Sequence, residues 1–97
     1  MSAEAALANR YQGPVRIMGS DGVFLTTGAA DLEDDPEMGS WKGMLQVLRG
    51  AAVAGKALVV QIEIPGGGSG RAQLTPAGEN GERAYSRVTG LGPGWPF

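Results

Sequence analysis

ALVVQIEI, residues 57–64, is the clearest secondary-structure signal in the chain. The run is apolar at its start and alternates between apolar and polar residues after Val60, which is typical of a strand that lies against a core. We expect a central β-strand here, and the other elements can be assigned outward from it.

On the C-terminal side of this strand, PGGGSG at residues 65–70 cannot hold regular structure and predicts a loop between two paired strands. Short apolar segments and turn-rich segments then follow each other. The elements expected there are a strand at Arg71–Thr75, a loop at Pro76–Glu82, a strand at Ala84–Thr89 and an extended tail at Gly90–Phe97.

On the N-terminal side, residues 11–18 and 23–27 predict a β-hairpin, because β-branched and aromatic residues lie on both sides of the turn sequence SDG at residues 20–22. Gly22 can supply the positive φ that such a turn needs. Residues 1–10 are alanine-rich, but an isolated helix of that length is marginal in water. We expect an N-terminal arm there.

The segment Ser40–Lys56 fits two patterns. Alternation places Trp41, Gly43, Leu45 and Val47 on one face of a strand, whereas helical spacing gathers a different apolar stripe that also begins at Trp41. We favour a strand at Ser40–Leu48, because a glycine in the middle of a helix costs about 1 kcal/mol relative to alanine. One helical turn remains an alternative at Arg49–Gly55.

Length and composition limit the architecture. The 97 residues suffice for one hydrophobic core, so we expect a single domain at residues 11–97 behind the arm at residues 1–10. The 17 glycines and 6 prolines indicate many turns, as in all-β meanders and barrels. The prediction is a mainly β fold, a small antiparallel barrel or sandwich of about six strands with a short N-terminal arm.

Charge and cysteine content limit the partners and the compartment. The net charge is −2, from 8 Lys and Arg against 10 Asp and Glu, so no general attraction to nucleic acid or to an anionic membrane is expected. The absence of cysteine suits a reducing compartment. No apolar run reaches the ~18 residues of a membrane span and the start of the chain lacks the pattern of a signal peptide, so we expect a cytoplasmic protein.

Two segments suggest ligand chemistry but fail its spacing rules. The glycine run at residues 65–70 has Arg71 where a dinucleotide-binding loop needs its last glycine and a nucleophile elbow needs a glycine. The acidic segment DLEDDPEMG, residues 31–39, begins like a calcium loop but has Pro36 where the sharp turn needs glycine and Lys42 where a glutamate should bind. We expect flexible and solvated loops, with no cofactor, metal or catalytic set.

Four aromatic residues are the candidates for ligand binding, because large flat side chains line cavities and anchor interfaces. Trp41 and Tyr85 lie in apolar strands, where packing in the core is the competing interpretation. Trp95 and Phe97 lie in the C-terminal tail, where they either close the end of the barrel or face a partner.

Several glycine-based motifs occur in a characteristic order from residue 11 to the end of the chain. They are Tyr11-x-Gly13-Pro14, Trp41-x-Gly43-x-Leu45, Gly70-x-Ala72 and Val88-Thr89-Gly90-x-Gly92-Pro93-x-x-Pro96-Phe97. Together they resemble an actinobacterial domain family of unknown function, found free-standing or appended to flavin-dependent monooxygenase-like proteins. Lys42 and Met44 depart from the more polar and aromatic surround that is usual in that family. The resemblance implies a small β-barrel with an accessory role and no known catalytic residue.

Three functions are compatible with these features. The first is a non-enzymatic accessory domain that binds an apolar small molecule or a partner protein, since the sequence has no His or Cys and no cofactor loop. The second is a structural homo-oligomer built through edge strands or the aromatic C-terminal tail. The third is a small barrel enzyme that uses a carboxylate such as Glu63 as its base, which would require that carboxylate in an apolar cavity.

Overall fold

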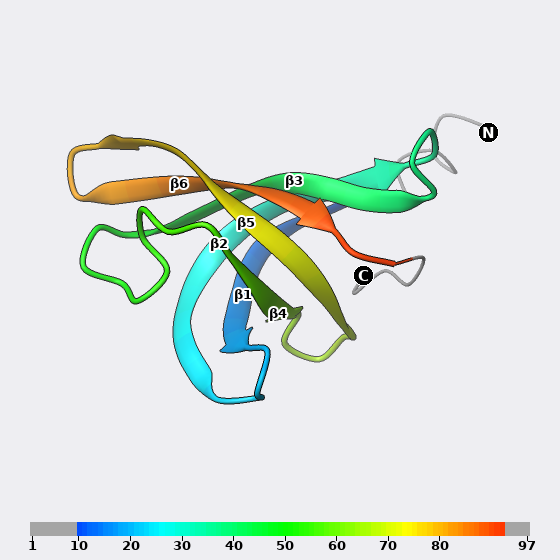
Figure 1. The fold of residues 1–97 in the computed structure, drawn as a ribbon, viewed down its shortest axis with the longest axis horizontal. Helices are drawn as coiled ribbons and strands as arrows, with labels where there is room; N and C mark the ends of the chain where they lie inside the picture. The colour runs from blue at the N-terminus through cyan, green and yellow to red at the C-terminus, as the bar shows by residue number, and fades with distance from the viewer. Residues whose placement is uncertain (1–9, 93–97) are drawn as a thin grey trace.

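A computed structural model of the chain describes residues 10–92. Six antiparallel strands close into a barrel in the order β1-β2-β3-β6-β5-β4 (Figure 1). Their bounds are Arg10–Gly19 for β1, Phe24–Asp35 for β2, Ser40–Leu48 for β3, Leu58–Glu63 for β4, Ser69–Asn80 for β5 and Arg83–Gly90 for β6. The predicted small antiparallel barrel of six strands is confirmed.

The strand signals at the two key segments are confirmed. β3 has the predicted bounds, and β4 lies within residues 57–64, between β5 and β1. The segment Arg49–Gly55, with its alternative of one helical turn, forms turns closed by hydrogen bonds from Ala51 N to Leu48 O and from Ala54 N to Ala51 O. Arg10 belongs to β1 rather than to the predicted arm, whose other residues lie outside the described part of the chain.

The loops predicted at residues 31–39 and 76–82 are both largely strand, so these two predictions were wrong. β2 continues through the acidic residues to Asp35, because Leu32 points into the barrel while the neighbouring carboxylates point to solvent. Pro76 lies within β5 beside a register shift between Pro76 and Gly78. Within residues 10–92, this end of β5 pairs only with β6, and a proline is tolerated where a strand has one partner.

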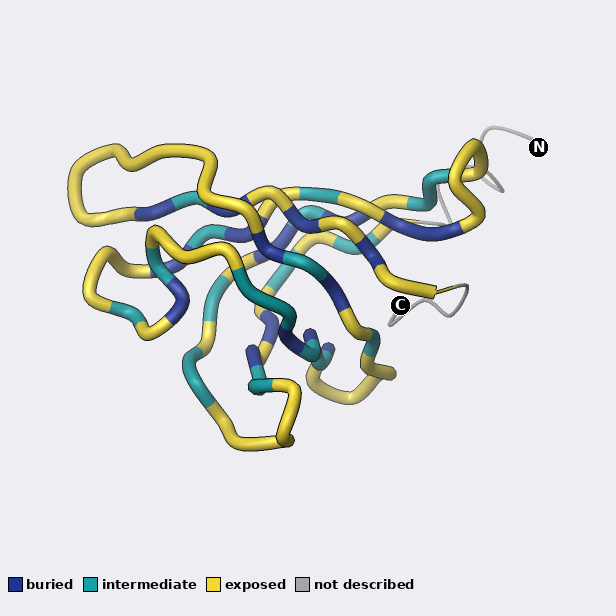
Figure 2. The backbone as a smooth tube through the Cα atoms, in the orientation of Figure 1, coloured by how far each residue is buried: buried dark blue, intermediate teal, exposed yellow. Residues whose placement is uncertain are grey.

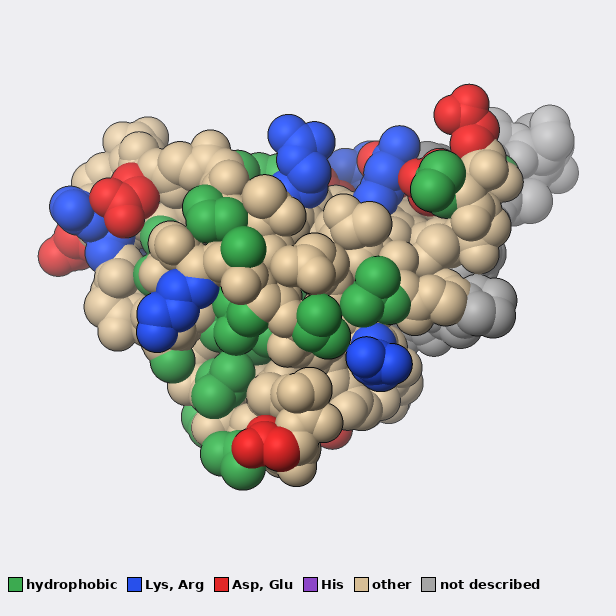
Figure 3. All heavy atoms as spheres, viewed as in Figure 1, with side chains coloured by type: hydrophobic (Ala, Val, Ile, Leu, Met, Phe, Trp, Pro, Cys, Tyr) green, Lys and Arg blue, Asp and Glu red, His purple; other side chains and the backbone are tan. Residues whose placement is uncertain are grey.

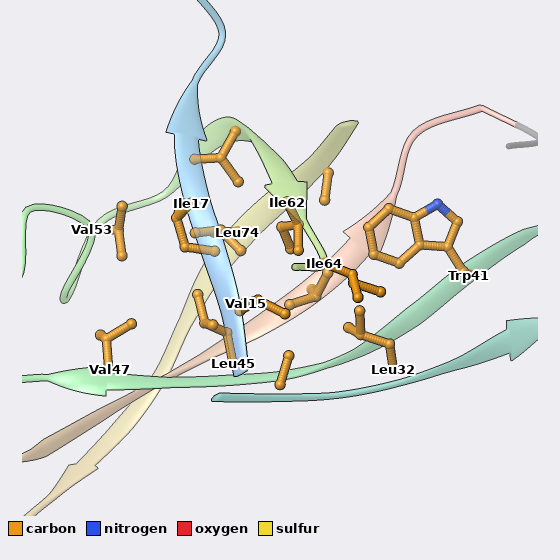
Figure 4. Close-up of a cluster of buried hydrophobic side chains, with 14 of the residues drawn as sticks. Val15, Ile17, Leu32, Trp41, Leu45, Val47, Val53, Ile62, Ile64 and Leu74 are labelled. Carbon is orange, nitrogen blue, oxygen red and sulfur yellow. The ribbon is translucent and has the colours of Figure 1, made fainter. Parts of the chain in front are cut away.

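Buried and exposed residues alternate along the strands (Figure 2). The buried side chains form one hydrophobic core inside the barrel. Ile17, Leu45, Ile62 and Leu74 are fully buried and come from four different strands (Figure 4). In small six-stranded barrels such inward side chains form the core itself. A ligand site therefore has to be sought on the outer wall or at the barrel ends.

Trp41 lies at one end of this core, next to Leu32 and Ile64 (Figure 4). Its side chain is 1% exposed. The indole packs on Gly90 of β6 so closely that a Cβ atom there would lie 2.6 Å from the ring. Gly43, two residues along β3, sits even closer to β2, and an added Cβ would collide with the backbone carbonyl of Asp31. The glycines on β3 and β6 thus set how tightly the wall can close.

Candidate functional site

A hollow of about 280 Å³ lies on the outer wall of the barrel, across β1, β2, β3 and β6. Two rows of cross-strand neighbours form its wall: Gln12, Asp31 and Met44 in one, and Ala29, Gln46 and Tyr85 in the other. The small Ala29 side chain stands between larger neighbours, and this difference in size gives the surface its depth. We call this feature the outer hollow.

The outer hollow combines apolar surface with polar groups that the protein leaves available. Met44 is 39% exposed and Tyr85 is half-buried, so thioether and ring offer apolar contact. No described residue forms a hydrogen bond with the Tyr85 hydroxyl or the Gln46 side-chain amide. A ligand in the hollow could therefore receive a hydrogen bond from either group and stack on the ring.

An exposed ion pair lies at the edge of the outer hollow, where Asp31 is one of the lining residues. Arg10 donates from Nε to Asp31 Oδ1 at 3.1 Å and from Nη2 to Asp31 Oδ2 at 2.9 Å. Gln12 donates from Nε2 to the same Oδ2 at 3.1 Å. The Arg10 bonds, more than any other cause, hold the pKa of Asp31 below its ordinary value, and they raise the pKa of Arg10. Asp31 is thus a stable anion that orients Gln12 and is a poor proton acceptor.

A second hollow of about 320 Å³ adjoins the first, and Met44 lines both. The charged side chains that line this second hollow are Glu33 and Asp35 from β2, Lys42 from β3 and Arg87 from β6. The outer wall is therefore apolar at Tyr85 and Met44 and charged further along β3. A binding partner on this wall would meet both kinds of surface.

The structure separates the four aromatic residues predicted to bind a ligand. Tyr85 lies in the outer hollow. Trp41 packs in the core, as the competing interpretation held. It also lines a different hollow at the end of the barrel. Trp95 and Phe97 lie outside the described residues. Trp41 and Tyr85 belong to opposite faces of the sheet and do not form one site.

Sequence reasoning missed most of the outer hollow. Gln12, Ala29, Met44 and Gln46 are ordinary residues on three different strands, and only the pairing register brings them together. The signal that could have found Met44 and Gln46 is their alternation with Leu45 and Val47, which marks them as outward-facing. Nothing local in the sequence indicates that Ala29 lies opposite Gln46.

The position of Glu63 does not support the enzymatic alternative. Glu63 lies on the outside of β4 with 41% of its side chain exposed, and Arg16 Nε is 3.4 Å from its Oε1. Glu63 therefore does not lie in the apolar cavity that would make its carboxylate a base. In the described part of the chain, no group of three or more His, Asp, Glu or Cys side chains is arranged to hold a metal ion.

Residues 10–92 contain no helix long and apolar enough to cross a membrane. The chain matches no protein-family model, no curated protein and no solved structure.

Proposed function

We propose that the chain is a non-enzymatic binding module whose ligand site is the outer hollow. The observation that carries the proposal is the Tyr85 side chain, which offers a half-buried ring and a hydroxyl without a partner among residues 10–92, next to the equally available Gln46 amide. Apolar surface with a few convergent polar groups is the usual composition of a ligand site.

The size of the hollow limits what it can hold. At about 280 Å³ it is slightly smaller than the usual range for small-molecule pockets, which begins near ~300 Å³. The fitting group is a single ring or a branched apolar side chain with a hydrogen-bonding neighbour. Such a group can belong to a free small molecule or to a residue of a partner protein.

The homo-oligomer alternative has weaker support. The barrel is closed, and in the described range the longer stretches with a strand on one side alone are residues 10–15 of β1, 75–80 of β5 and 24–28 of β2. Pro14 lies in the first of these parts and Pro76 in the second. Prolines at strand edges are a common protection against pairing with another chain, because they lack the N–H donor.

We also propose the accessory role and the cytoplasmic location expected from the sequence. The closed barrel agrees with the fold that the resemblance to the actinobacterial family implies, but a small barrel is too common to identify a family. The absence of cysteine remains the support for a reducing compartment.

The proposal is tested by titrating N-acetyl-phenylalaninamide, a neutral ring probe, into the isotope-labelled full chain and following backbone amides by NMR. The expected shifts concentrate on β2, β3 and β6 around the hollow. Ala29→Phe should abolish them by filling the hollow, while Thr27→Phe, an exposed position two residues along β2, should leave them unchanged. Shifts that scatter over the surface or survive in Ala29→Phe would exclude the hollow as the site.

A further inference from the structure

The outer face of β6 carries two arginines on either side of Tyr85. Arg83 and Arg87 are both exposed, and alternation along the strand places them on the same face as Tyr85. With a rise of about 3.3 Å per residue, each arginine lies about 7 Å from Tyr85 along the strand, and the two are about 13 Å apart. A cation, a ring and a second cation thus follow each other along one face of β6.

The pairing register gives neither arginine an acidic neighbour. Arg83 lies opposite Leu48 on β3 and Asn80 on β5. Arg87 lies opposite Met44 on β3 and Thr75 on β5. The residues directly opposite both charges are therefore neutral, although cross-strand positions are where sheets usually place opposite charges.

Three other arginines of the barrel form ion pairs inside the molecule, whereas Arg71 on the outside of β5 has none among residues 10–92. Ion pairs join Arg10 to Asp31 at 2.9 Å, Arg16 to Glu63 at 3.4 Å and Arg49 to Glu79 at 3.3 Å. Within residues 10–92, Arg83 and Arg87 have no such partner. Their guanidinium groups are therefore free to pair with carboxylates of another molecule, which arginine does with two parallel hydrogen bonds.

We infer that the outer face of β6 docks an extended acidic segment of a partner protein with the pattern acid-x-apolar-x-acid. Its apolar side chain enters the outer hollow beside Tyr85, and its two carboxylates pair with Arg83 and Arg87. Alternate residues of an extended segment point to the same side, so the spacing of the segment matches that of β6. This inference rests on the proposed binding function and names the partner for the same site.

The surrounding charges favour this partner over a nucleic acid. Glu82 precedes Arg83 in the β5–β6 turn and Glu79 lies opposite Ala84 on β5, while Glu33 and Asp35 line the same hollow as Arg87. Figure 3 shows Asp and Glu side chains at both ends of the long axis, over the β5–β6 turn and the β2–β3 turn. A continuous polyanion would extend into both acidic ends, whereas a segment with two carboxylates fits between them.

A second copy of the chain does not supply the segment. The acidic residues that lie four apart in the 97-residue sequence are Asp31 with Asp35 and Glu33 with Glu37. Both pairs have another acidic residue at the middle position, where the hollow calls for an apolar side chain. The partner is therefore a different protein.

The test uses two acetylated and amidated pentapeptides, Glu-Thr-Phe-Thr-Glu and its uncharged counterpart Gln-Thr-Phe-Thr-Gln. Each is titrated into the labelled full chain at about 10 mM salt, where the screening length is about 30 Å. The acidic peptide should shift amides on β3 and β6 and bind about ten times more tightly than the Gln peptide, as two exposed charge pairs allow. The difference should shrink at about 0.15 M salt.

Two variants locate the effect. Arg83→Glu combined with Arg87→Glu should remove the preference for the acidic peptide and leave binding of the Gln peptide within about twofold. Arg71→Glu, a matched reversal on the outside of β5, should leave the preference intact. Because all three arginines are exposed, the variants should keep the fold, which a thermal melt checks.

Three results would overturn the inference: equal affinities for the two peptides, an equal loss of preference in Arg71→Glu, or tighter binding of a single-stranded oligothymidylate than of the acidic peptide. Broadening of the free protein's resonances with rising concentration, relieved by the double reversal, would assign the face to a second copy instead.

If the Gln peptide and the ring probe still bind in the hollow, only the choice of partner fails. If neither binds there, the proposed function fails with it.

Discussion

The hydroxyl of Tyr11 donates a hydrogen bond of 2.6 Å to the backbone carbonyl oxygen of Pro14. In the described range, this part of β1 pairs with β2 alone, because the pairing with β4 begins at Arg16. The Tyr11 side chain also lies against Gly13, where an added Cβ would be 2.9 Å from the hydroxyl oxygen. A side chain thus covers a stretch of strand that has a neighbour on one side only.

Tyr11→Phe should lower the free energy of unfolding by about 1 kcal/mol, because it removes this hydrogen bond and keeps the ring. Urea denaturation measures the change. Tyr85→Phe is the matched control, since no described residue bonds the Tyr85 hydroxyl, and it should change stability by less than about 0.5 kcal/mol. Equal effects of the two substitutions would mean that the Tyr11 bond contributes nothing to stability.

Gly43→Ala should destabilise the barrel by about 3 kcal/mol or more, because the added methyl group would collide with the backbone of β2, which cannot rotate away as a side chain can. Gly50→Ala is the control. Gly50 is exposed, and a Cβ atom added there would have nothing within 4 Å, so stability should change by less than about 0.5 kcal/mol. Thermal melts of both variants check the difference, and a stable Gly43→Ala barrel would contradict the close approach of β2 and β3.

Ser86→Ala should leave stability unchanged or raise it by up to about 1 kcal/mol. Ser86 is fully buried, and its hydroxyl has no hydrogen-bond partner in the described part of the chain, so it carries a desolvation cost that alanine avoids. Ser40→Ala should instead cost about 1 kcal/mol, because the Ser40 hydroxyl donates to the carbonyl oxygen of Gly92 at 2.9 Å. Denaturation midpoints that move in the same direction for both serines would refute this assignment.

Acid should remove the stabilisation that Asp31 provides. The Arg10 hydrogen bonds lower the folded-state pKa of Asp31 below its ordinary value of 3.8, so the contribution is complete above that value and is lost as the pH falls through the lower folded-state pKa. The stability difference between the natural chain and Asp31→Asn should therefore be largest at neutral pH and disappear in strong acid. Carboxyl NMR titration should show that Arg10→Gln moves the Asp31 midpoint upward, and an unmoved midpoint would rule out Arg10 as the cause.

The fold was predictable where alternation is strong and both sides of a strand are paired. Alternation assigns Trp41, Leu45 and Val47 to one face of β3, and all three are buried. The acidic end of β2 was predicted to be a loop because its charge outweighed the alternation of Leu32 with Asp31 and Glu33. The sequence shows that these carboxylates are solvated, but a solvated side chain fits the outer face of a strand as well as a loop.

The site was predictable only in part. Tyr85 was a candidate because aromatic residues are few, but its neighbours in the outer hollow depend on which residues of β2 and β3 lie opposite each other. Register is a long-range property that one strand does not reveal, since a shift of one residue would turn every side chain to the other face. For the same reason, the sequence does not show that the residues directly opposite Arg83 and Arg87 are neutral.

β6 serves two purposes with alternate residues: Ala84, Ser86 and Val88 point inward, while Arg83, Tyr85 and Arg87 point outward. Substitutions at the outward set leave the buried contacts in place, so recognition can change over evolution without a matching loss of folding stability. The same separation makes the barrel a convenient scaffold for engineering. New partners could be selected from libraries at the outward positions of β3 and β6, with most library members still expected to fold.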